Sequence, residues 1–176
     1  MNESWQTLSE EEIDRNPWWT HLLRRFQTPA GRTGDYHLMV NRNAVNVFAQ
    51  DHDGRFVMVR EYRYVFDRIS VAQAMGGIEP GETAEGAVIR ELREETGYEA
   101  ATVVRLGVTA TAPAFSHEEC TVFYVTDLKK VGEHDHEILE VIHMSVGEID
   151  EAIRRGEIWD SNAISSWCMV KLHLGL

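Results

Sequence analysis

Three glutamates at helical spacing are the residues of this chain best suited to chemistry. Glu91, Glu94 and Glu95 lie in the stretch GGIEPGETAEGAVIRELREETGYEA, residues 76–100. On a helix, residues three and four apart share a face, so the three carboxylates would point in nearly the same direction and repel one another. Hard oxygen ligands grouped in this way suit Mg²⁺ or Mn²⁺, which keep positions open for water and substrate phosphates. The spacing therefore predicts a divalent-metal site.

The residues around the glutamates distinguish this stretch from a solvated acidic helix, in which Arg90 would simply pair with Glu94 at i, i+4. From Gly76 through Glu82 to Gly97 the chain follows the pattern G-x5-E-x7-R-E-L-x-E-E-x-G. This pattern resembles the signature of the Nudix hydrolases at every fixed polar and glycine position. It also falls where a strand, a loop and a helix are expected in succession, which is the context that the signature requires.

The resemblance implies a fold, a reaction and roles for individual residues. Nudix hydrolases have an α/β/α sandwich fold and cleave a nucleoside diphosphate linked to another group, X. Water must then attack a phosphorus surrounded by negative oxygens, and divalent cations offset that charge. By resemblance, Glu91, Glu94 and Glu95 are ligands of Mg²⁺, with Mn²⁺ as the alternative. Arg90 would orient these carboxylates, and the backbone carbonyl of Met75 would be a further ligand.

Weaker matches over about residues 30–175 make the chain similar to the ADP-ribose pyrophosphatases and other nucleoside-diphosphate-sugar hydrolases. They include VREYRY at 59–64, Pro113 sixteen residues after Gly97, and GEIWDSNAISSW at 156–167. The expected products are a nucleoside monophosphate and a sugar phosphate. The stretch AQAM at 72–75 differs from the Glu-Leu-Pro-Ala usual before the first glycine, so the base and sugar stay open, with GDP-mannose among the alternatives. A nucleotide-sensing module without activity is disfavoured because the glutamates are retained.

Substrate-binding residues are expected in VREYRY, just before the signature. Arg63 and Arg60 would bind the diphosphate, because a guanidinium fork matches phosphate oxygens. Tyr62 or Phe66 would stack on a base. The alternatives are strand-edge solubility for the two arginines and a core role for the two aromatic residues. Pro113 would line the same site.

Catalysis also needs a base for the attacking water, which the resemblance places on a mobile acidic loop outside the signature. The loop GEHDHE at 132–137 has that position and character. Glu137 is the first candidate and Asp135 the second, and Glu118, in the loop after Pro113, is a third candidate that would also contact substrate. The alternative is a flexible, solvated loop with no catalytic role.

Short β-rich runs and three helical segments must position these residues. A helix is predicted from Thr83 or Ala84 to Thr96, ended by Gly97 in the left-handed conformation. Two more helices are expected near the C-terminus, over 146–158 and 162–174, the second capped by Asp160 or Ser161. The strand candidates span 36–40, 44–50, 55–66, 102–112 and 120–128. This order predicts an α/β domain with a mixed sheet flanked by helices.

The chain is expected to comprise an N-terminal arm, residues 1–35, and a Nudix domain, residues 36–176. The arm gathers apolar side chains between turn signals, among them Trp18, Trp19 and Phe26. Such a cluster needs a surface to cover it, either in its own domain or on a partner subunit, unless it closes one end of the core. The resemblance implies a homodimer in which the arm crosses to the other subunit.

Composition limits the partners and the compartment. A net charge of −12 disfavours binding along nucleic acid, and no stretch approaches the length of a membrane span or forms a secretory signal. Two cysteines are too few for a disulfide framework and favour a reducing cytoplasm. A zinc site is the rival metal hypothesis, without the close ligand spacing that such sites show. Its candidate ligands are His117, Cys120, His134, His136 and Cys168.

Overall fold

The computed structural model describes residues 4–176, and the chain divides into two compact units. The N-terminal unit contains the chain up to Arg42 together with Ala110–Glu119. The main unit contains Asn43–Thr109 and Cys120–Leu176. None of the helices formed by the described residues is both long enough and apolar enough to cross a membrane.

The main unit is built on a seven-stranded mixed sheet with the order β10-β5-β4-β9-β8, in which β6 pairs with β5 and β7 with β4. The central pair β4 and β9 is parallel, whereas β5 and β7 run antiparallel to β4. The strands are β4 (Ala44–Gln50), β5 (Phe56–Arg63), β6 (Arg68–Ala72), β7 (Ala74–Gly77), β8 (Tyr98–Ala110), β9 (Glu119–Lys130) and β10 (Ile138–Met144).

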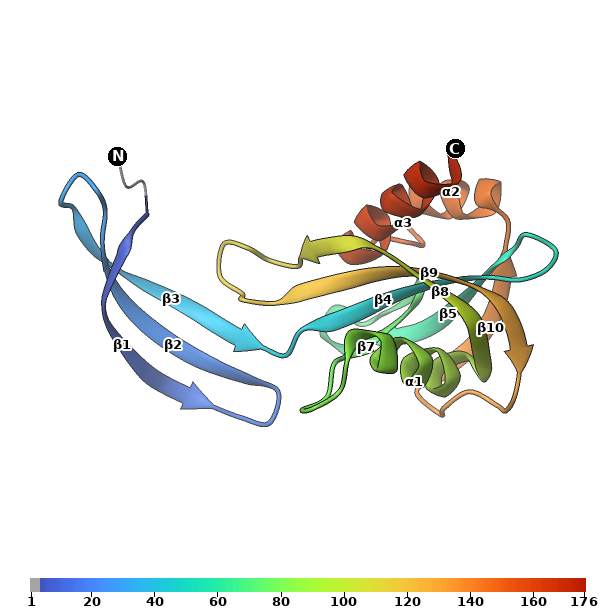
Figure 1. The fold of residues 1–176 in the computed structure, drawn as a ribbon, viewed down its shortest axis with the longest axis horizontal. Coiled ribbons are helices and arrows are strands. Elements are labelled where there is room, and N and C mark those ends of the chain that lie inside the picture. The colour runs from blue at the N-terminus through green and yellow to red at the C-terminus, as the bar shows by residue number, and fades with distance from the viewer. Residues whose placement is uncertain (1–3) are drawn as a thin grey trace. The chain divides into compact units, whose positions relative to one another are not determined.

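Helices cover both faces of this sheet, as Figure 1 shows: α1 (Ala84–Thr96) lies on one face, and α2 (Val146–Arg154) and α3 (Ser161–Leu174) lie on the other. The side chains of β4 alternate between the two faces. Val45, Val47 and Ala49 belong to the cluster that packs on α1, and Phe48 belongs to the cluster with α2 and α3. The predicted α/β/α sandwich with a mixed sheet is therefore confirmed.

Local capping fixes the ends of α1 and α3 close to where the sequence predicts them, whereas α2, predicted over 146–158, ends earlier at Arg154. The Thr83 side chain accepts a hydrogen bond from the Gly86 N–H at the start of α1, and Gly97 ends the helix with φ of 70°. The Asp160 carboxylate caps α3 by accepting from the N–H groups of Asn162 and Ala163. The helix prediction of 84–96 is confirmed, and of the two proposed caps for the last helix Asp160 is the correct one.

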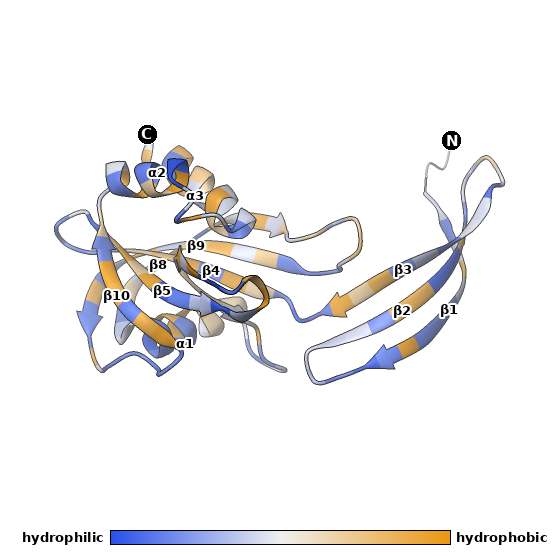
Figure 2. Cartoon of the chain, turned by 180° about the vertical axis from the view of Figure 1, so that it is seen from behind, coloured by the Kyte–Doolittle hydropathy of each residue, from blue (hydrophilic) through white to orange (hydrophobic). Residues whose placement is uncertain are grey.

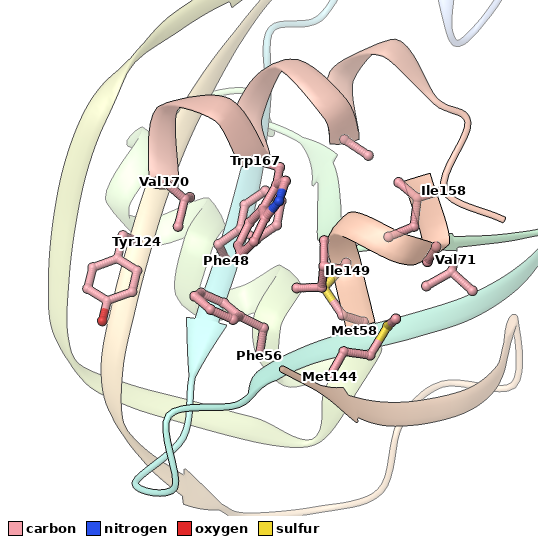
Figure 3. Close-up of a cluster of buried hydrophobic side chains, with 12 residues drawn as sticks. Phe48, Phe56, Met58, Val71, Tyr124, Met144, Ile149, Ile158, Trp167 and Val170 are labelled. Carbon is pink, nitrogen blue, oxygen red and sulfur yellow. The ribbon is translucent and has the colours of Figure 1, made fainter. Parts of the chain in front are cut away.

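Trp167 of α3 is the centre of the core on the α2 and α3 face (Figure 3). Its ring centroid lies 4.9 Å from that of Phe56 and 5.6 Å from that of Phe48. The indole N–H donates to Asp150 at 2.8 Å, so the one polar atom of this buried ring has an acceptor. This packing holds α2 and α3 against β4 and β5.

The N-terminal unit contains a three-stranded antiparallel sheet of β1 (Gln6–Arg15), β2 (Trp19–Gln27) and β3 (Thr33–Asn41). The sequence pattern predicts a strand only from Tyr36, so β1 and β2 are additional findings. Two irregularities in the β1–β2 register interrupt the period-2 alternation by which a strand is recognised. All ten residues of β1 are exposed, and Figure 2 shows this strand as mainly hydrophilic with isolated hydrophobic bands.

Candidate active site

Arg90 stands at the centre of the carboxylate cluster on α1. Its Nε and Nη2 donate to the two carboxylate oxygens of Glu82 at 3.0 and 2.8 Å, and Nη2 also donates to the Gly77 carbonyl at 2.8 Å. Nη1 donates to Glu91 at 2.7 Å and to Glu94 at 3.1 Å. Every N–H of the guanidinium thus has an acceptor, and the hydrogen bonds from Arg90 lower the pKa of Glu82 to about 2.

Gly76 brings the backbone of β7 against the carboxylate of Glu91. A Cβ atom at position 76 would lie 2.0 Å from Glu91 Oε1, so no residue with a side chain fits while this carboxylate keeps its place. Glu91 is only 9% exposed. Burial raises its pKa, against the opposing hydrogen bond and charge of Arg90. The backbone of β7 and helix α1 therefore pack closely around the Glu91 carboxylate.

Glu95 differs from Glu91 and Glu94, which both accept hydrogen bonds from Arg90. The Oε2 atom of Glu95 accepts a hydrogen bond from the Met75 N–H at 3.2 Å. Burial raises the pKa of Glu95 to about 8, and the negative charges of Glu61 and Glu91 add to this rise while Met75 and Arg63 oppose it. A carboxyl group in these surroundings favours a proton or a cation as its partner.

The three predicted metal ligands lie on the same helix but turn toward different neighbours. Glu91 and Glu94 face Arg90, whereas Glu95 lies beside Met75. Within residues 4–176, no three His, Cys, Asp or Glu side chains form a group that could hold a metal ion. The donor set itself suits a hard divalent cation, because the side-chain donors of Glu91, Glu94 and Glu95 are all carboxylate oxygens.

The residues of the rival zinc hypothesis do not form a metal-binding group among the described residues either. The Nδ1 atom of His134 is 2.9 Å from the carbonyl oxygen of Asp135 in its own loop. Cys120 is buried on β9, and Cys168 is exposed on α3. This structure therefore gives the zinc hypothesis no support.

The main unit contains a cleft of about 620 Å³. It is lined by residues 61–66, which end β5 and form the short 3₁₀ helix η1 (Tyr64–Phe66), and by Glu137, Trp159 and Asp160. Four predicted residues thus share one cavity: Arg63, Tyr62, Phe66 and Glu137. The Tyr62 hydroxyl donates to Asp67 at 2.6 Å, which fixes the ring at the edge of the cleft.

Arg63 connects the cleft with the glutamates of α1. Its Nη2 lies 3.5 Å from the Met75 sulfur, and Met75 in turn donates its N–H to Glu95. Arg63 also forms an ion pair with Glu61. Burial raises the pKa of Glu61, and Arg63 opposes this rise while Asp160 and Glu137 add to it. The cleft therefore contains more carboxylates than its single arginine neutralises.

Four of the predicted substrate-binding and base residues lie outside the cleft lining. Arg60 pairs with Glu140 of β10 at 3.5 Å, and Asp135 donates its backbone N–H to the Glu94 carbonyl at 2.8 Å. Pro113 and Glu118 belong to the N-terminal unit, where Pro113 lines a separate cavity of about 240 Å³. Glu118 accepts a hydrogen bond from the Asn41 side chain at 3.1 Å in that same unit.

Trp159, Asp160 and Glu61 line the cleft although the sequence did not mark them as site residues. Glu61 lies within VREYRY, between the two predicted arginines, and its position there was a usable signal. Asp160 was assigned only the capping role that it does perform. Trp159 lies within GEIWDSNAISSW, but that match did not indicate its ring contact with Phe66, with centroids 4.8 Å apart, because the two residues are distant in the chain.

Comparisons of the sequence and of the fold with known proteins agree with one another. The NUDIX domain model matches residues 40–166. The chain is 26% identical over 160 residues to the ADP-ribose pyrophosphatase of Bacillus subtilis, covering 89% of this chain and 86% of that protein. It is 31% identical over 167 residues to the ADP-ribose pyrophosphatase of Mycobacterium tuberculosis, covering 91% and 80%. The crystal structure of an ADP compounds hydrolase matches the fold with a TM-score of 0.87 at 21% identity, covering 97% and 94% of the chains.

Proposed function

This chain belongs to the Nudix family as a pyrophosphohydrolase, and from that premise we propose that its substrate is a nucleoside diphosphate sugar of the ADP-ribose type. Mg²⁺-dependent hydrolysis would give a nucleoside monophosphate and a sugar phosphate. The observation that carries this proposal is a series of contacts that links Glu95 to the cleft. Glu95 accepts from the Met75 N–H, the Met75 sulfur contacts Arg63, and Arg63 lines the cleft with Glu137. Two relatives named ADP-ribose pyrophosphatase support the choice of substrate.

Glu91, Glu94, Glu95 and the Met75 carbonyl are the proposed ligands of Mg²⁺, with Mn²⁺ as an alternative. A bound divalent cation would offset the charge of the diphosphate and lower the pKa of the attacking water. Arg90 is the positioning residue, because its hydrogen bonds hold the side chains of Glu91 and Glu94 on the helix face. Removing Arg90 would leave these carboxylates without a fixed orientation.

Arg63 is the proposed diphosphate-binding residue and Glu137 the proposed general base. A guanidinium fork at the cleft can bind two phosphate oxygens, which would displace Glu61 from its ion pair. Glu137, on the same cavity, would take the proton of the water that attacks phosphorus, and the phosphorus–oxygen bond to the leaving phosphate would break. Asp135 and Glu118 are the alternative bases, and Arg60, Tyr62 and Pro113 the further substrate contacts.

A homodimer is the proposed assembly, with the arm of residues 1–35 meeting a second copy and residues 36–176 forming the hydrolase domain. Large apolar side chains of the N-terminal unit are exposed, including Trp5 at 57% and Trp18 at 76%. A sheet with every β1 residue exposed has little core of its own, so a partner surface would stabilise it. The proposed compartment is the cytoplasm. A monomeric mass by light scattering would refute the dimer.

The test is a panel of sugar nucleotides assayed with Mg²⁺, with the products identified by mass. ADP-ribose, GDP-mannose and UDP-glucose differ in base and sugar but share the diphosphate. We expect a nucleoside monophosphate and a sugar phosphate from at least one of them, and no turnover in excess chelator. Turnover that survives removal of divalent metal, or a panel with no substrate at all, would contradict the proposal.

A further inference from the structure

Three aromatic residues, Tyr64, Phe66 and Trp159, line the cleft together with Arg63 and Glu137. The rings of Phe66 and Trp159 meet edge to face with centroids 4.8 Å apart, and Tyr64 lies with Phe66 on η1. Tyr64 is 86% and Phe66 62% exposed, so both side chains present apolar surface at the cleft. We call Tyr64, Phe66 and Trp159 the aromatic wall.

Trp159 is held in place in a way that favours a binding role for its ring. The Arg68 guanidinium lies 3.7 Å from the ring centroid, and the Val71 N–H donates to the Glu157 carbonyl at 3.2 Å, which joins β6 to the segment before Trp159. The indole N–H is inaccessible to solvent and has no hydrogen-bond partner among the described residues. Such an unpaired group costs about 1–3 kcal/mol, so indole is a poor choice here for stability alone.

The carboxylates that line the cleft together with the aromatic wall suit a ring that carries hydroxyl groups. Glu61, Glu137 and Asp160 accept hydrogen bonds when ionised and cannot donate them. A nucleobase presents acceptors as well as donors at its edge, whereas every sugar hydroxyl can donate to a carboxylate. The apolar face of a sugar ring can also pack on an aromatic ring. In the proposed function Arg63, the cationic side chain of the lining, binds the diphosphate, which leaves the carboxylates to bind the X group.

We propose that the aromatic wall holds the sugar of the X group, with Trp159 as the residue that determines specificity for it. This inference rests on the proposed diphosphate hydrolysis, because the diphosphate at Arg63 directs the neighbouring sugar into the cleft. The sugar would lie against the wall with its hydroxyls toward the carboxylates. The nucleoside would extend away from this cavity.

The experiment compares Trp159→Ala with the wild type on substrates that change one end at a time. ADP-glucose and the methyl ester of ADP share a base and differ in the sugar, whereas ADP-glucose and UDP-glucose share the sugar and differ in the base. We expect kcat/KM for ADP-glucose to fall roughly tenfold or more, mainly through KM, and for the methyl ester to fall less than about threefold. The ratio between ADP-glucose and UDP-glucose should stay unchanged.

Further variants separate binding from folding. Phe66→Ala removes an exposed ring and should show the same preference, Trp159→Phe should restore most of the loss, and Leu172→Ala, 74% exposed on α3, should match the wild type. An equal loss on all substrates, or a changed ratio between the bases, would overturn the proposal. So would a loss confined to CDP-choline, whose X group is a cation.

Calorimetry with ADP-glucose in excess chelator gives a readout that does not depend on turnover. Weaker binding to Trp159→Ala than to the wild type, with equal binding of the methyl ester, would support the wall even if no substrate is hydrolysed. In that case the proposed function fails and the sugar site stands. Unchanged binding of ADP-glucose to the variant would overturn the sugar site while leaving the hydrolase in place.

Discussion

Glu95 and Asp150 are both partly buried carboxylates of the main unit, yet their surroundings differ. Asp150 accepts the indole N–H of Trp167 at 2.8 Å and the Lys171 ammonium at 3.0 Å. Burial alone would raise the pKa of Asp150, but these hydrogen bonds outweigh it and hold the pKa below its usual value. Glu95 has the Met75 N–H as its hydrogen-bond donor, and its pKa is raised to about 8.

The difference extends to other carboxylates of the two regions. Asp51, at the turn between β4 and β5, has a lowered pKa, whereas Glu61 and Glu91, near Glu95, have raised ones. Asp150 and Asp51, which we call the scaffold carboxylates, thus receive their hydrogen-bond donors from the folded chain. Glu61, Glu91 and Glu95 have raised pKa values because burial outweighs the positive charges of Arg63 and Arg90 beside them. We infer that a ligand from outside completes the second group, which is how a binding site differs from a structural one.

The largest expected effect comes from Glu95→Gln. The amide keeps an oxygen that can accept from the Met75 N–H but removes the negative charge, so the fold should persist while a proposed metal ligand is lost. Turnover with Mg²⁺ should fall about 10³-fold or more, equivalent to roughly 4 kcal/mol of transition-state stabilisation. Steady-state assays and thermal unfolding of the same preparation measure the two quantities.

Glu85→Gln is the matched control for this substitution. Glu85 lies in the first turn of the same helix and is exposed, so its replacement should change neither turnover nor the unfolding temperature appreciably. Activity of Glu95→Gln within tenfold of the wild type would show that the raised pKa marks no functional charge. A large loss of stability in Glu95→Gln would mean that Glu95 stabilises the fold, as the scaffold carboxylates do.

A smaller effect, on stability alone, is expected from Asp150→Ala. The substitution leaves the Trp167 N–H without its acceptor and Lys171 without its ion pair, and should lower the free energy of unfolding by about 2 kcal/mol. Glu151→Ala, which removes an exposed ion pair with Arg154, should change it by less than about 0.5 kcal/mol. Urea unfolding gives both values. Equal costs for the two variants, or lost activity in Asp150→Ala, would erase the distinction between the regions.

The parts of the fold set by local interactions could be predicted from the sequence. Thr83 and Gly97 fix the ends of α1 because a cap acts within one helical turn, and the glutamate spacing then defines one helix face. The strands β1 and β2 could not be predicted, because their pairing is irregular and their alternation is broken. Their formation depends on neighbouring strands, which the local pattern does not reveal.

Long-range contacts also limit what the sequence predicts about the site. The stretch AQAM departs from the usual sequence and left the base and sugar open, and its residues Ala72, Gln73 and Ala74 are fully buried. The Gln73 amide donates to Asn46 at 2.9 Å, and Asn46 donates to Ser166 at 2.8 Å across 120 residues of sequence. This polar chain joins β6 and β7 to α3 inside the core. The departure from the usual sequence here is therefore tied to packing.

The smallest effect is expected from replacing Asp51, and it is identified by how the free energy of unfolding depends on pH. Burial would raise its pKa, but hydrogen bonds from His143 at 2.6 Å and from the backbone N–H groups of Arg55 and Asp53 lower it below the ordinary value of 3.8. Because the folded-state pKa is depressed, the stabilisation is complete above about pH 4 and is lost as pH falls through that lower value.

Asp51→Asn should therefore cost about 1 kcal/mol near neutral pH, and its stability should converge with that of the wild type below about pH 4. Urea unfolding at several pH values measures the gap, with Asp53→Asn, which changes an exposed side chain in the same turn, as the control. A gap that stays constant into acid would mean that the charge of Asp51 contributes nothing. The scaffold carboxylates would then differ from Glu95 in hydrogen bonding alone, and the contrast in charge between the two regions would rest on Asp150.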